Sequence, residues 1–126
     1  LKMVSKTDIN VFSAGKKETV SCNVTLTSLN NSHNLNFDSE QIMLSICLRD
    51  VVDLQDFYNL LKGKEKKNIL HCTLSNEEKE YKALRKVLFK NKKISVSLGG
   101  IRVEFNSSIN DDFIKTLESL KSKMGI

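Results

Sequence analysis

His71 and Cys72 are adjacent residues whose types could support nucleophilic or metal chemistry. A Cys thiol beside a His base is the arrangement of cysteine nucleophiles, and both side chains are common zinc ligands. Both lie in the apolar run 68–74, which predicts a strand in which neighbouring side chains point to opposite faces. His33 lies in a polar stretch without a partner motif. We therefore predict no catalytic or metal site at these residues.

Acidic residues form two further candidates. Asp50, Asp53 and Asp56 recur every three residues, and three carboxylates are a possible Mg²⁺ site. However, Asp53 has the type and position of a helix N-cap, and Asp56 falls in the first turn, where negative charge is favourable. Asp111 and Asp112 also suit a helix start, and adjacent helical side chains diverge by about 100°. We predict structural roles for all five, and no cofactor.

A set of lysines is the sharpest candidate binding feature. If the segment 76–90 is a helix, its lysines at positions 79, 82, 86 and 90 lie on one side of it and could follow a phosphate backbone. The chain has 20 Lys and Arg residues, but only Arg49, Arg85 and Arg102 are Arg, which is the residue that makes bidentate contacts to phosphates and bases. A solvated face and a nucleic-acid-binding face therefore remain alternatives for Lys79, Lys82, Lys86, Lys90, Lys92 and Lys93.

Composition sets the class of protein. The chain has 126 residues, of which 40% are hydrophobic and 28% charged, and this predicts a single domain over residues 1–126. Three cysteines lie in apolar runs, and their odd number favours free thiols in a reducing, cytoplasmic environment. No run approaches the roughly 20 apolar residues of a membrane helix, so we expect no membrane partner.

Alternating patterns predict the strands that would position these residues. Residues 18–29 alternate apolar and polar side chains, and we expect them to pair with residues 9–13 through a turn at 14–17. Residues 42–48 and 68–74 predict two further strands, whereas the Asn- and Ser-rich segment 30–36 predicts a loop.

The last two strands, 94–98 and 101–105, have the clearest local signature. Gly99 and Gly100 are suited to the positive φ angles of a two-residue hairpin turn. In that register one face holds three opposed apolar pairs, Leu98 with Ile101, Val96 with Val103 and Ile94 with Phe105.

Three helices are expected, each with a buried apolar face. The first runs from Asp53 to Gly63, the second over 76–90 after the capping-box pattern at 75–78, and the third over 109–123. Their predicted inward stripes are Leu54, Phe57, Tyr58 and Leu61; Tyr81, Leu84 and Leu88; and Phe113, Leu117, Leu120 and Met124.

These patterns together predict an α+β fold. We expect a mostly antiparallel sheet of about six strands with three helices on one face, in the order β-β-β-α-β-α-β-β-α. Because no catalytic constellation is present in the sequence, we expect a non-catalytic binding or assembly module whose partner is another protein. The alternative is an accessory nucleic-acid-binding protein that uses the six lysines.

Overall fold

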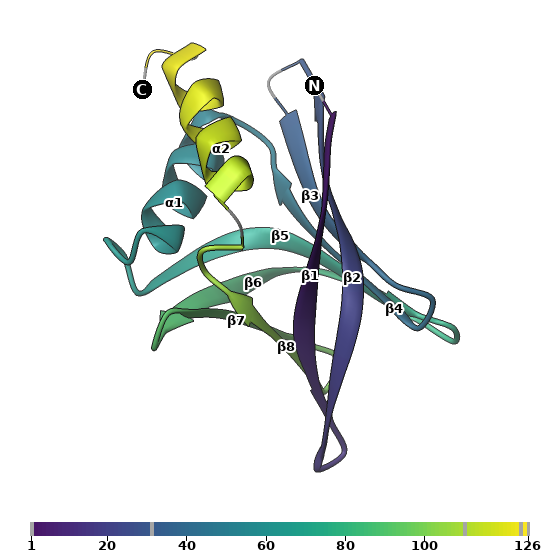
Figure 1. Cartoon of the computed structure of the whole chain (residues 1–126). Helices are drawn as coiled ribbons and strands as arrows, with labels where there is room; N and C mark the ends of the chain where they lie inside the picture. Colours follow the sequence, from purple (N-terminus) through teal and green to yellow (C-terminus); the bar gives the residue numbers. More distant parts are fainter. Residues whose placement is uncertain (1, 31, 110, 124, 126) are drawn as a thin grey trace.

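The computed structural model describes residues 2–30, 32–109, 111–123 and 125. Eight antiparallel strands form a closed barrel in which each strand pairs with its chain neighbours and β8 returns to β1 (Figure 1). In chain order the elements are β1 (Lys2–Ser13), β2 (Lys16–Leu29), β3 (Ser32–Asp38), β4 (Ile42–Leu48), α1 (Val51–Leu61), β5 (Lys67–Asn76), β6 (Glu80–Lys90), β7 (Lys93–Leu98), β8 (Ile101–Asn106) and α2 (Asp111–Lys123).

Apolar side chains fill the barrel. Alternate residues of each strand point inward, as in β4, where Leu44, Ile46 and Leu48 are fully buried. The rings of Phe37 in β3 and Phe105 in β8 meet with centroids 4.4 Å apart, although their strands are not neighbours in the sheet. Contact across the interior at this level is expected for eight strands, which leave just enough room for side chains.

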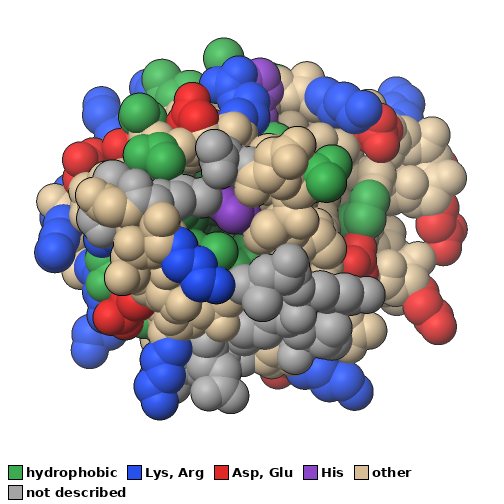
Figure 2. All heavy atoms as spheres, turned by 90° about the horizontal axis from the view of Figure 1, so that it is seen from above, with side chains coloured by type: hydrophobic (Ala, Val, Ile, Leu, Met, Phe, Trp, Pro, Cys, Tyr) green, Lys and Arg blue, Asp and Glu red, His purple; other side chains and the backbone are tan. Residues whose placement is uncertain are grey.

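The two helices lie together at one end of the barrel (Figure 1). Helix α1 contributes Leu54, Phe57 and Leu60 to the same core as the strands, and α2 contributes Leu117 and Leu120. Neither helix among the described residues is long and apolar enough to cross a membrane. Seen from the helix end, cationic side chains lie around the rim with acidic ones between them (Figure 2), so this view shows no surface of a single charge.

The predicted fold class is wrong: the molecule is a closed eight-stranded barrel with two helices, not an α+β sheet with three helices on one face. One missing strand is β3, which we predicted as a loop because of its Asn residues. Its inward positions are Leu35 and Phe37, together with His33. Outward Asn36 bonds to both neighbouring strands, donating to Thr25 Oγ1 at 3.3 Å and accepting from Ser45 Oγ at 2.6 Å. These cross-strand bonds make an Asn-rich strand stable.

The second missing strand is β6, which we predicted as a helix. The capping-box pattern forms a tight turn instead, in which Asn76 Oδ1 accepts from the backbone N–H groups of Glu78 and Lys79, both at 2.9 Å. Leu84 and Leu88, predicted to be buried, are exposed, and Val87 is buried. A four-residue spacing keeps side chains on one face of a strand, because four is even, and also on one face of a helix.

The C-terminal hairpin is confirmed in its predicted register, with the three expected apolar pairs opposite one another. The pairing of the first two strands is also confirmed. The helix after β4 is present, but Asp50 caps it and Asp53 lies in its first turn. In α2, Leu117 and Leu120 are buried as expected. Four further residues named for the predicted C-terminal helix have side chains that lie outside the described part of the structure: Asp111, Asp112, Phe113 and Met124.

Candidate functional site

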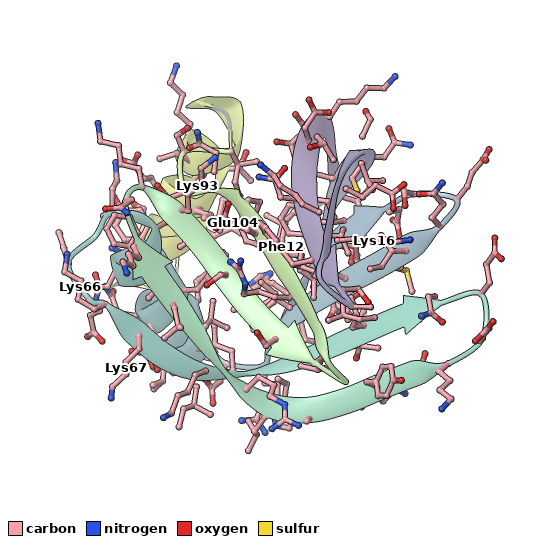
Figure 3. All side chains as sticks on the ribbon, turned by 90° about the horizontal axis from the view of Figure 1, so that it is seen from below. Phe12, Lys16, Lys66, Lys67, Lys93 and Glu104 are labelled. Carbon is pink, nitrogen blue, oxygen red and sulfur yellow. The ribbon has the colours of Figure 1, made fainter. Side chains whose placement is uncertain are left out.

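The ladder between β6 and β7 is short. A two-residue turn joins the two strands, and its residues Asn91 and Lys92 have φ angles of 52° and 60°. Beyond this ladder β6 continues beside β5 as far as Glu80, and β7 continues beside β8 as far as Leu98. A wedge therefore separates residues 80–87 from residues 96–98. Figure 3 shows the two ribbons diverging from the end near Lys93, with side chains between them. The ladder itself consists of Leu88↔Ser95, Phe89↔Ile94 and Lys90↔Lys93.

Tyr81 covers the wide end of this wedge. A Cβ atom added to Gly99 would lie 2.6 Å from the Tyr81 ring, so the ring lies against the glycine backbone of the β7–β8 turn. Beside the ladder lies a pocket of about 400 Å³, which is lined by residues of β5, β6, β7 and β8. We refer to it as the β6–β7 groove.

Exposed apolar side chains gather at the groove. Ile69, Leu84 and Leu88 line it with 56%, 51% and 41% of their surfaces exposed. They are three of the five large hydrophobic residues that are exposed in the described part of the chain. Single exposed leucines are ordinary on protein surfaces, but a cluster beside a concave region is typical of a binding site.

The groove is also cationic. Arg102 is held in place, with Nη1 3.3 Å from Glu104 Oε2 and its guanidinium 3.8 Å from the centre of the Phe12 ring. Arg85 and Lys86 also line the groove, and neither forms an ion pair with any residue that the structure describes. Two positive charges therefore lie beside the apolar cluster without local compensation, which favours an anionic partner.

The backbone of β6 is open along the wedge. Phe89 N–H donates to Lys66 C=O at 2.8 Å, so the odd-numbered residues of β6 direct their backbone groups toward β5. In an antiparallel ladder the alternate residues direct theirs to the other side. The N–H and C=O groups of Lys82, Leu84 and Lys86 therefore face the wedge, where none of the three has a ladder partner in β7.

The structure places the six predicted lysines on a strand and its flanking turns, not on a helix. Lys82, Lys86 and Lys90 share the outward face of β6, and Lys93 lies opposite Lys90 on β7. The remaining two lie in turns, Lys79 before β6 and Lys92 after it. Lys82 Nζ is 3.3 Å from Glu80 Oε1 in an exposed ion pair. Of the predicted lysines, Lys86 lines the β6–β7 groove, while Arg85, Ile69 and Arg102 are groove residues that sequence reasoning missed.

His71 and Cys72 are neighbours on β5, where the side chain of His71 is half-buried and that of Cys72 is buried. Burial raises the pKa of Cys72 to about 12, which keeps the thiol protonated. The ladder places Cys47 of β4 opposite His71, a pairing that sequence reasoning did not anticipate. Within the described residues, no group of three or more His, Cys, Asp and Glu side chains is placed to hold a metal ion.

The acidic triplet has local structural partners. Asp50 Oδ1 accepts from the backbone N–H of Asp53 at 2.9 Å, as an N-cap does. Asp53 Oδ2 accepts from Arg49, from the backbone N–H at 3.0 Å and from Nε at 3.4 Å. Two of the three carboxylates therefore stabilise the start of α1, and Asp56 lies one turn further along the helix.

His33, predicted in a loop, is a buried residue of β3. Its Nδ1 lies 2.6 Å from Ser28 Oγ, and its buried Nε2 has no hydrogen-bond partner among the residues that the structure describes. Burial lowers the pKa of His33, because an imidazolium loses more solvation than a neutral ring.

Comparison of the chain with protein families, curated proteins and solved structures gives no match.

Proposed function

We propose that this protein is a non-catalytic binding module that docks a segment of another protein in the β6–β7 groove. The observation that carries the proposal is the cluster of Ile69, Leu84 and Leu88 beside the uncompensated charges of Arg85 and Lys86. An apolar centre with a charged border is the usual composition of a protein-binding surface.

The apolar cluster has enough exposed surface to matter for affinity. Full burial of a Leu or Ile side chain contributes about 1.5–3 kcal/mol, so covering the exposed half of each of the three contributes about 1 kcal/mol. Together they would supply about 3 kcal/mol, roughly a hundredfold in affinity. The cations would add selectivity for acidic partners more than affinity.

Nucleic-acid binding is the alternative, and the shared face of Lys82, Lys86 and Lys90 favours it. Leu84 and Leu88 alternate with these lysines on the same face. Proteins that bind single strands generally place aromatic rings between their cations, because bases stack on them. Aliphatic side chains in these positions favour a protein partner.

The proposal is tested with phage-displayed peptides selected on the whole chain. Peptides that bind the wild type should lose at least tenfold in affinity for the double variant Leu84→Ser, Leu88→Ser. The matched control is Val52→Ser, which removes an exposed apolar side chain from α1 and should leave affinity unchanged. A selection that yields no peptide dependent on Leu84 and Leu88 contradicts the proposal.

The nucleic-acid alternative is measured in parallel with labelled 20-nucleotide RNA and single-stranded DNA. Retention that weakens steeply between about 50 and 200 mM salt, and is abolished when Lys82, Lys86 and Lys90 become Glu, would establish the alternative. Unchanged mobility at low salt would eliminate it.

A further inference from the structure

We propose that the docked segment adds to the barrel as a β-strand along the open edge of β6, and that it has an acidic–x–apolar–x–acidic pattern. This inference rests on the proposed function and specifies its partner. It is carried by the backbone of β6 and by the order of side chains on its outward face.

The open edge of β6 presents hydrogen-bonding groups at strand spacing. Lys82, Leu84 and Lys86 direct backbone N–H and C=O groups into the wedge, and successive pairs lie about 7 Å apart along the strand. An extended segment presents complementary groups at the same interval. Its addition would satisfy all three pairs, as peptides do when they extend a sheet edge.

The side chains beside that edge set the partner's sequence. In an added strand, residues directly opposite have Cβ atoms about 4.5–5.5 Å apart on the same face. Positions opposite Lys82 and Lys86 would therefore place acidic groups next to cations, and the position opposite Leu84 would bury an apolar side chain. Because alternate residues share a face, these three positions are separated by one residue each.

The same lysines disfavour pairing between two copies of the chain. Antiparallel pairing of two β6 edges centred on Leu84 would place Lys82 of each copy opposite Lys86 of the other. Like charges directly opposite each other destabilise a sheet, and lysines on edge strands protect proteins in this way. The edge is therefore protected against self-association and open to an acidic strand.

The first test uses two synthetic peptides, SETLTES and its charge-reversed control SKTLTKS, with fluorescence anisotropy at low salt. We expect SETLTES to bind at least tenfold more tightly. Each backbone amide of SETLTES is then N-methylated in turn. In strand addition alternate amides face β6, so methylation at one alternating set should abolish binding, and methylation at the other set should not.

The second test changes the protein at one backbone group. Lys86→Pro removes an N–H that faces the wedge and takes no part in pairing with β5, and a proline is tolerated at such edge positions. Lys86→Ala removes the same charge and keeps the N–H. We expect the proline variant to bind SETLTES at least tenfold more weakly than the alanine variant. If the proline variant is unfolded by circular dichroism, the N-methylated peptides decide the question without it.

The two levels of the proposal fail differently. Binding that requires Leu84 and Leu88 but is insensitive to amide methylation would leave the groove as a docking site and overturn strand addition. Equal binding of SETLTES and SKTLTKS would overturn the acidic pattern. Loss of every groove-dependent peptide in the phage selection would overturn the proposed function itself.

Discussion

Two leucines on paired strands should differ sharply in their contribution to stability. Leu70 of β5 points into the core with 1% of its surface exposed, whereas Leu84 of β6 is 51% exposed at the groove. We predict that Leu70→Ala strongly destabilises the protein and that Leu84→Ala does not.

The magnitudes follow from burial. Leu70→Ala removes buried carbon atoms and leaves a cavity, which typically costs about 2–5 kcal/mol. Leu84→Ala loses the contacts of only the half of the side chain that is shielded from water, and solvent or neighbouring side chains fill the space. Its cost should be about 1 kcal/mol or less. The difference between the two variants is then about 2 kcal/mol.

Urea denaturation followed by circular dichroism measures this difference. With a slope of about 1–3 kcal/mol per molar urea, the midpoints of the two variants should differ by about 1 M. If Leu84→Ala costs as much as Leu70→Ala, then Leu84 is part of the core, as a helix over 76–90 would require. That result would remove the exposed apolar cluster on which the groove rests.

Three further predictions concern the turn, the buried histidine and the thiols. Gly99→Ala should cost at least about 1 kcal/mol more in urea denaturation than Gly100→Ala, because both have positive φ but only the first meets the Tyr81 ring; equal costs would contradict that packing. Burial lowers the pKa of His33 below its ordinary 6.5, so the unfolded chain binds more protons than the folded one in acid. The free energy of unfolding should therefore keep its full value above about pH 6.5 and decrease as the pH falls below 6.5. In denaturation measured from pH 7.5 to 5, His33→Gln should weaken this pH dependence. Burial raises the pKa of Cys22 to about 11 and that of Cys72 to about 12; both should resist dithiobisnitrobenzoate at pH 8 until urea is added, and rapid labelling of either in the folded protein would refute their burial.

The elements that could be predicted from the sequence are those whose local and long-range signals agree. The turn at Gly99 and Gly100 sets the register of β7 and β8, and the apolar alternation requires the same register. Strand β4 was also predicted to the residue, because all of its inward positions are Ile or Leu. In these segments a single period explains which residues point inward.

Barrel closure could not be predicted, because it depends on pairing between residues far apart in sequence. Strands β1 and β8 meet through Asn10, Val11 and Phe12 opposite Glu104, Val103 and Arg102, which lie 90 to 94 residues away in sequence. Nothing in either segment specifies this partner. Two strands predicted as a loop and a helix also left the expected sheet too narrow to close, since eight strands form this barrel.

The groove could not be predicted for a related reason. Ile69, Leu84 and Arg102 come from three strands, and only the separation of β6 from β7 brings them to one surface. The lysines were found because they are close in sequence, although the element that carries them was wrong. Their spacing by four residues survives the change from helix to strand, so three of them still share a face.

Strand β6, one of the two strands that the sequence analysis missed, also carries the candidate site, and one physical cause explains both facts. A strand with one face in solvent normally places polar residues on that face. β6 places Leu84 and Leu88 there, four residues apart, and this departure from strand alternation is what imitates a helical stripe. Exposed apolar residues on an open strand edge carry a risk of aggregation, which Lys82, Lys86 and Lys90 counter on the same face. If stability alone governed this face, polar residues at 84 and 88 would remove the risk at little cost. Departures from local rules concentrate at functional sites, so these two leucines are the residues at which a partner should first be sought.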